Sequence, residues 1–64
     1  MEDPIIAALA AIQDELTKAI QEALKFNNGN SSAGTRVRRA MQNIKSQAQV
    51  VRMEVQAKKN ESVL

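Results

Sequence analysis

The sequence lacks most of the side chains from which catalytic, metal and redox sites are built. Its 64 residues include no cysteine, histidine, tryptophan or tyrosine, and a single phenylalanine. Disulfides and thiol chemistry are therefore excluded, and the usual zinc ligands are missing. Without histidine or a deep core that forms a pocket, we expect no enzyme activity, no small-molecule substrate, no metal and no cofactor.

Long hydrophobic runs are also absent. No segment approaches the ~20 apolar residues that cross a bilayer. The chain opens on the acids Glu2 and Asp3, whereas a secretory signal opens on basic residues. An amphipathic helix lying on a membrane surface is a weaker alternative, because its apolar face would lack bulky aromatic residues. We therefore expect a cytoplasmic protein without a membrane partner.

The small size of the chain limits its core. We expect one domain over residues 1–64, and a chain of this length buries only about 60% of its unfolded surface. Neither a disulfide nor a metal site is available to add stability. Self-association, as a homodimer or a larger oligomer, is the remaining way to complete the core.

The net charge of +2 hides an uneven distribution. Residues 1–30 hold two lysines against five acids, and residues 31–64 hold seven basic residues against two acids. Such a division is typical of a protein with one side facing a polyanion. Attraction between two packed helices of opposite charge explains it equally well at this point.

Proline and glycine are rare, and they mark the ends of two expected helices. Asp3 followed by Pro4 predicts a helix start, with the aspartate as its cap. The run Asn-Asn-Gly-Asn at residues 27–30 predicts its end, and Ser31 or Ser32 is expected to cap the next helix.

These signals predict an all-α fold, an antiparallel hairpin of two long helices. We expect a helix over residues 4–26, a loop over 27–31, a helix over 32–59 and a frayed tail over 60–64. The loop is short, so the second helix must fold back along the first.

Apolar residues recur at alternating steps of four and three in both halves, which is the pattern of a heptad seam. In the first helix the seam ends at Phe26, which is thereby assigned to the core. Further apolar residues widen the stripe enough for more than one neighbouring helix. We expect hairpins to pair into a four-helix bundle or coiled coil through Ile5, Leu9, Ile12, Leu16, Ile20, Val37, Met41, Ile44, Val51 and Val55.

A second stripe on the second helix is basic and contains no acid. Stepping by four and three from Arg38 alternates basic residues with glutamines as far as Lys59. Arginine and lysine contact phosphates, and glutamine bonds to sugar, phosphate or base atoms. An ordinary solvated face is the alternative, although such faces normally mix charges of both signs.

The helix start beside this stripe offers a second feature for an anion. Unpaired N–H groups of a first helical turn attract phosphate, and Ser32, Thr35, Arg36 and Arg39 would add hydroxyls and charge there. Gly34 permits either close helix packing, which we favour, or close approach of a phosphate. The predicted DNA contacts are Ser32, Thr35, Arg36, Arg38, Arg39, Gln42, Lys45, Gln49, Arg52, Gln56 and Lys59.

Residues 29–45, GNSSAGTRVRRAMQNIK, resemble the chlamydial-type, linker-histone-like nucleoid proteins of bacteria, and residues 50–59 resemble them more loosely. The resemblance implies a small helical protein that coats or compacts DNA without strong sequence preference. The residues that match the family's motif, and to which the implied DNA-binding role carries over, are Gly34, Thr35, Arg36, Arg38, Lys45 and Arg52.

The sequence therefore leaves two functions open. The leading prediction is a histone-like, nucleoid-associated protein that coats, bridges or compacts DNA with little sequence preference, in a salt-sensitive manner. The alternative is a structural coiled-coil module that binds itself or a partner protein. In that case carboxylates of the first helix, Asp14, Glu15 and Glu22, would pair with the basic stripe across an interface. Whether Arg38, Lys45 and Arg52 are paired with carboxylates separates the two.

Overall fold

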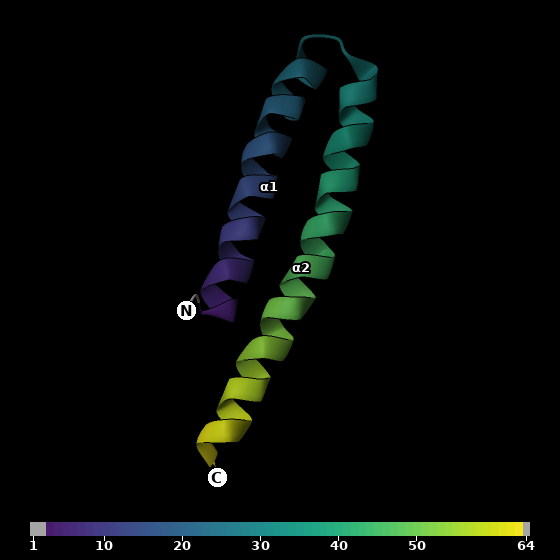
Figure 1. Cartoon of the computed structure of the whole chain (residues 1–64). Helices are drawn as coiled ribbons and strands as arrows, with labels where there is room; N and C mark the ends of the chain where they lie inside the picture. Colours follow the sequence, from purple (N-terminus) through teal and green to yellow (C-terminus); the bar gives the residue numbers. More distant parts are fainter. Residues whose placement is uncertain (1–2, 64) are drawn as a thin grey trace.

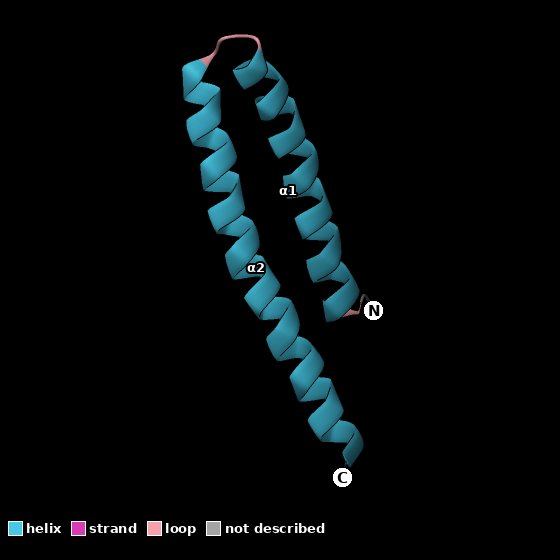
Figure 2. Cartoon of the chain, turned by 180° about the vertical axis from the view of Figure 1, so that it is seen from behind, coloured by secondary structure: helices cyan, strands magenta, loops and turns pink. Residues whose placement is uncertain are grey.

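The computed structural model describes residues 3–63, which form two helices joined by a tight turn. Helix α1 spans Pro4–Asn27 and helix α2 spans Ser31–Val63. They run antiparallel, and α2 extends past the start of α1 (Figure 1). From behind, the described chain is helical except at its start and in the turn (Figure 2). The predicted all-α hairpin is confirmed.

The start of α1 is capped as the sequence predicts. Asp3 has an extended backbone, and its Oδ1 accepts hydrogen bonds from the N–H groups of Ile5 at 2.8 Å and Ile6 at 3.1 Å. Pro4 occupies the first helical turn, where its missing N–H costs no helical bond.

The turn is shorter than predicted, and a different residue caps α2. Gly29 has a φ of +102°, a backbone conformation that residues other than glycine rarely adopt. Its N–H donates to the Phe26 carbonyl at 3.0 Å. Asn30 Oδ1 then accepts from the Ala33 N–H at 3.3 Å. The expectation that Ser31 or Ser32 caps this helix was therefore wrong. Asn30 already stands three residues before Ala33, so the helix begins at Ser31.

The end of α2 also differs from the prediction. The helix continues to Val63, so the frayed tail expected from residue 60 was wrong for residues 60–63, and Leu64 lies outside the described residues. No proline or glycine interrupts the chain after Gly34. Gln56 Nε2 also donates to Asn60 Oδ1 at 3.1 Å, across one turn of the helix.

The two helices touch through small side chains. The buried residues are alanines: Ala19 is 6% exposed, Ala33 0% and Ala40 8%. Larger apolar residues on either side of them are only half-buried; they are Ile5, Ile12, Val37, Ile44 and Val51. No described side chain larger than alanine is buried, so the hairpin by itself has almost no hydrophobic core.

The largest apolar side chains point outward instead. The exposed ones are Ile6, Leu9, Leu16, Ile20, Leu24, Phe26, Met41, Val50, Met53 and Val55, with exposed fractions from 37% to 63%. The assignment of Phe26 to the core was wrong, because the side chain is 51% exposed at the hairpin end. Its ring lies against Gly34, where a Cβ would stand 2.7 Å from Phe26 Cε1. This contact supports the packing explanation of Gly34.

Candidate functional site

Two hollows between the helices identify the two broad faces of the hairpin. One is lined by Ala23, Phe26, Ser31, Gly34, Thr35, Val37 and Arg38. The other is lined by Glu15, Lys18, Ala19, Glu22, Arg36, Arg39, Ala40 and Asn43. Because a helix turns ~100° per residue, Arg36 and Arg38 point about 200° apart. They therefore belong to different faces of the molecule.

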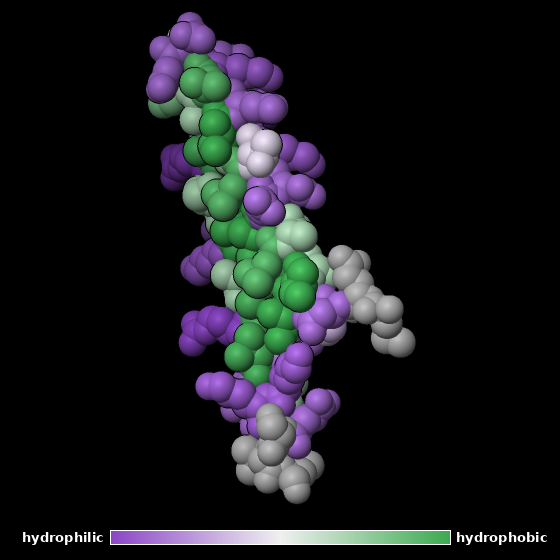
Figure 3. Space-filling model, turned by 90° about the vertical axis from the view of Figure 1, so that its left-hand side faces the viewer, coloured by the Kyte–Doolittle hydropathy of each residue, from purple (hydrophilic) through white to green (hydrophobic). Residues whose placement is uncertain are grey.

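The first hollow lies at the end of an apolar face. In packed helices, residues seven positions apart lie on the same face. Leu16 and Leu9 therefore share the face of Ala23 on α1. Met41 and Val55 share the face of Gly34 on α2. We define the apolar face as Ile6, Leu9, Leu16, Ile20, Met41 and Val55, all of them exposed. Seen from the side of α1, apolar side chains form a band along most of the molecule with polar side chains on both flanks (Figure 3).

The outer edge of this face on α2 is a row of cations. Arg38 lines the first hollow, and steps of seven lead to Lys45, Arg52 and Lys59; these four residues are the basic row. All four are exposed. Within residues 3–63, neither an ion pair nor a hydrogen bond engages the side chains of Arg38, Lys45 and Arg52. The glutamines of the predicted stripe, Gln42, Gln49 and Gln56, are exposed beside the row.

The opposite face carries mixed charge. Arg36 Nε donates to Glu22 Oε2, and Lys25 Nζ lies 3.3 Å from the other oxygen of the same carboxylate. The hydrogen bond from Arg36 lowers the pKa of Glu22, and the bond and charge of Lys25 add to that effect. Asn43 Nδ2 donates to Glu15 Oε1 at 3.2 Å. Arg36 and Arg39 thus lie on this face. The sequence predicts that they widen the basic row, and the structure places them away from it.

The start of α2 is less open to an anion than expected. Ala33 is fully buried, and its N–H donates to Asn30 through both the carbonyl oxygen, at 3.1 Å, and Oδ1. Ser32 Oγ donates to the same Oδ1 at 2.8 Å. Thr35 is exposed at the first hollow. A phosphate there would have to compete with Asn30 for the hydroxyl of Ser32.

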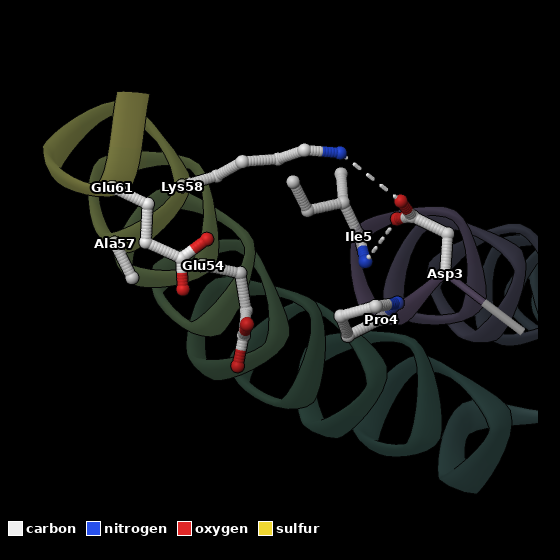
Figure 4. Close-up of a pocket in the computed structure, with 7 residues that line it drawn as sticks. All are labelled: Asp3, Pro4, Ile5, Glu54, Ala57, Lys58 and Glu61. Carbon is white, nitrogen blue, oxygen red and sulfur yellow. Dashed lines mark hydrogen bonds and ion pairs between the residues drawn. The ribbon is translucent and has the colours of Figure 1, made fainter. Parts of the chain in front are cut away.

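A third hollow lies where α1 begins, beside a contact that the sequence does not predict. Lys58 reaches from α2 across Ile5 to Asp3, with 3.3 Å between Lys58 Nζ and Asp3 Oδ2, while Glu54 and Glu61 line the α2 side (Figure 4). The N–H of Ile6 is the largest cause of a lowered pKa of Asp3, with smaller contributions from Ile5 and Lys58. The described residues contain no cluster of three or more histidine, cysteine, aspartate or glutamate side chains that could hold a metal.

Two of the α1 carboxylates that could have paired with the basic stripe are engaged within the hairpin instead. Glu22 and Glu15 make contacts within the hairpin, to Arg36 and Asn43, and neither contacts the basic row. The basic row borders the apolar face on α2, without a carboxylate in its line. In the part of the chain that the structure describes, no helix is long and apolar enough to cross a membrane.

Comparison with known proteins gives one finding. The family model described as "Histone H1-like protein Hc1" matches residues 6–61, which include nearly all of both helices. Neither the curated proteins nor the solved structures gave a match. A histone H1-like family indicates a DNA-binding nucleoid protein, which is not a class of enzyme. The resemblance at residues 29–45 is thereby confirmed, and the chain belongs to the histone H1-like protein Hc1 family.

Proposed function

We propose that this protein binds duplex DNA with little sequence preference through the basic row and its neighbouring glutamines. The supporting observation is the row itself: Arg38, Lys45 and Arg52 are exposed, lie on one line of α2, and have no carboxylate partner within the described residues. A cationic line without acids is suited to a phosphate backbone, and Lys59 extends it along the helix.

The geometry of the row fits backbone contacts. Its members are seven residues apart, which is about 10 Å along a helix, or the rise of about three base pairs. Glutamine side chains between them reach sugar and phosphate oxygens. The nearest aromatic side chain, Phe26, lies at the turn beside Gly34 and is far from most of the row. Recognition would therefore rest on charge rather than on stacking.

The salt dependence follows from the number of charges. Each neutralised phosphate contributes about −0.9 to the slope of log K against log salt. Three or four contacts per copy predict a fall in affinity of roughly 40–150-fold between 50 and 200 mM salt. Two unrelated duplexes of equal length should give the same slope.

A gel-shift series with matched variants tests the proposal. Arg38→Gln, Lys45→Gln and Arg52→Gln together should weaken binding to both duplexes and lower the slope by about 2.7. The control removes the same number of cations from the mixed-charge face, with Lys18→Gln, Arg36→Gln and Arg39→Gln, and should bind nearly as the unchanged protein does. Absence of binding at ~50 mM salt, affinity indifferent to salt, or equal loss in the two variants would contradict the proposal.

Self-association is part of the proposed function. The chain exposes 5240 Å², against about 4,000 Å² for a compact protein of 7.0 kDa. A standard interface buries about 800 Å² on each partner, so a second copy can cover about two thirds of this surplus of roughly 1,200 Å². We infer that the protein acts in the nucleoid, in the cytoplasm, as a homodimer or larger oligomer.

A second candidate function is an assembly module without a nucleic-acid role, and the exposed apolar face favours it. Both candidates predict oligomers. They differ in the basic row: an assembly module would retain its oligomeric state while the gel shift with duplex DNA stays negative at low salt.

A further inference from the structure

We propose that a second copy covers the apolar face with its α2 lying against α1 of the first copy, both turns at the same end. The basic rows then lie on opposite edges of the four-helix bundle, and one dimer bridges two duplexes. The bridging step rests on the proposed DNA binding, whereas the packing arrangement stands independently of it.

The contacts within the hairpin fix which residues of α1 and α2 lie at the same height. Arg36 is bonded to Glu22, and Asn43 to Glu15. Because the helices are antiparallel, each step forward along α2 is a step back along α1. Lys45 is therefore level with Gln13. By the same rule Arg38 is level with Ile20, and Arg52 with Ile6.

These three levels match the two outer edges of the apolar face. On α2 the edge is the basic row; on α1 it is Ile6, Gln13 and Ile20, which are seven residues apart. All three α1 residues are exposed, Ile6 to 63% and Ile20 to 61%. The α1 edge carries no charge, so Arg38, Lys45 and Arg52 each have a neutral residue at their own height on the other helix.

A two-fold axis parallel to the helices makes use of this match. It keeps every residue at its height and places α2 of the second copy beside α1 of the first. The methylene stems of Arg52 and Arg38 from one copy then cover Ile6 and Ile20 of the other, while the guanidinium groups stay in water at the edge. Lys45 lies across from Gln13, whose amide oxygen can accept its hydrogen bond.

The alternative two-fold axis is perpendicular to the helices and places like helices together. The two α2 helices would then be neighbours, and both basic rows would lie along one edge of the bundle. Like charges brought together along an interface repel each other and disfavour that partner arrangement. No carboxylate lies in the row to offset this repulsion. Charge therefore selects the arrangement in which α1 meets α2.

The selected arrangement determines how a dimer meets DNA. Each row occupies the edge between α2 of its own copy and α1 of the other, and the two edges face away from each other across the bundle. Two helices side by side are about 20 Å wide, which is too wide for one duplex to contact both rows along their length. Each edge thus holds a separate duplex.

Cysteine cross-linking tests the packing, since the natural sequence contains no cysteine. Chains carrying Gln13→Cys and chains carrying Lys45→Cys are mixed, unfolded, refolded together and treated with a short bis-maleimide. We expect cross-linked dimers from the mixture, and little product from either variant alone. The matched control is a mixture of Asp14→Cys and Ser46→Cys chains. These positions are one residue away at nearly the same heights on the opposite side, and this mixture should not cross-link.

Three results would overturn the packing: efficient cross-linking of Gln13→Cys or Lys45→Cys alone, which indicates like helices together; product from the Asp14 and Ser46 mixture; or no product from any combination. Circular dichroism on each variant establishes that the helices are retained. None of these measurements requires DNA, so they stand whether or not the gel shift succeeds.

A bead assay tests the bridging step. One duplex is fixed to beads, and capture of a second, labelled duplex is measured at low salt. The unchanged protein should capture it, and Leu9→Gln with Leu16→Gln on the apolar face should bind the fixed duplex without capture. A protein that gives a gel shift and the expected cross-links but captures no second duplex would overturn bridging. Failure of the gel shift itself would overturn the proposed function.

Discussion

At the residue scale, Glu22 explains why Arg36 is ion-paired within the hairpin whereas Arg38 is not. The carboxylate is bonded to Arg36 on α2 and to Lys25 on its own helix, next to the turn. It thus compensates two cations and ties the helices together. Arg38, two residues along, has no such carboxylate within the described residues. The sequence places both arginines in one basic segment, and the helix rotation between them gives them different environments.

The lowered pKa values of Glu22 and Asp3 predict a loss of stability in acid. A carboxyl group whose pKa is lower in the folded state stabilises the fold above its unfolded pKa, about 4.3 for glutamate and 3.9 for aspartate. That contribution is lost as the pH falls through the folded value, below the usual range. Melting temperature should therefore fall between pH 5 and pH 2.

Substitution assigns this acid dependence to a residue. Glu22→Gln should lower the melting temperature at pH 7 and make its fall in acid shallower, because the group that titrates is gone. Asp14→Asn is the control, since the exposed Asp14 makes no hydrogen bond or ion pair within residues 3–63. A Glu22→Gln protein with the same acid profile as the unchanged chain would refute the assignment.

Caps and glycines show how far single residues can be predicted. Asp3 followed by Pro4 predicts a helix start with the aspartate as its cap, and the structure confirms it. At the second helix, Asn30, Ser31 and Ser32 are all good caps, and local preference cannot choose among them. The positive φ of Gly29 turns the chain so that Asn30 meets the Ala33 N–H. The choice is made by turn geometry, which the sequence does not display.

At the element scale, the period of the apolar residues predicts the helices and leaves open which stripe packs inward. Two apolar stripes run side by side on each helix. On α1, Ile5, Ile12 and Ala19 lie beside Leu9 and Leu16; on α2, Ala33, Val37, Ala40 and Ile44 lie beside Met41 and Val55. In the hairpin the alanines take the close contact, because small side chains let the two backbones approach, and the larger residues flank it. The heptad seam is thus divided: Ile5 and Ile12 pack within the chain, and Leu9 and Leu16 face outward.

The alanine contact predicts intolerance of larger side chains. Ala40→Leu, at a site that is 8% exposed, should destabilise the protein by about 1–3 kcal/mol, because the added atoms push the helices apart. Each kcal/mol corresponds to a fall of roughly 4–8 °C in melting temperature for a domain of this size. Ala11→Leu on the exposed surface should change stability by less than about 0.5 kcal/mol. Equal melting temperatures for the two variants would show that the alanine contact does not hold the helices together.

At the scale of the whole molecule, the hairpin has two surfaces that are each incomplete. The apolar face has no covering within the described residues, and Arg38, Lys45 and Arg52 at its edge have no carboxylate partner among them. Because the row lies at the edge of the face and not within it, the proposed dimer contact would leave the charged ends of the row open to the proposed DNA contact. The resemblance to histone-like proteins was readable from the motif, but this adjacency needed the relative rotation of both helices.

Removing the apolar face should therefore separate self-association from folding. Leu9→Gln with Leu16→Gln replaces side chains that are 49% and 44% exposed in the hairpin, keeps good helix formers and leaves the net charge unchanged. A dimer loses four leucines, and each contributes about half of the 1.5–3 kcal/mol of a fully buried side chain, because about half of it is already covered in the hairpin. The dissociation constant should therefore rise at least ~100-fold. The unchanged protein should sediment as a dimer whose melting temperature rises with concentration. The variant should sediment as a monomer and melt at a temperature independent of concentration. Val50→Gln with Met53→Gln is the control. It removes two side chains outside the apolar face that are at least as exposed, at 49% and 61%, and this variant should remain dimeric. If this control dissociates while the leucine variant stays a dimer, the contact between copies lies on the other side of the hairpin.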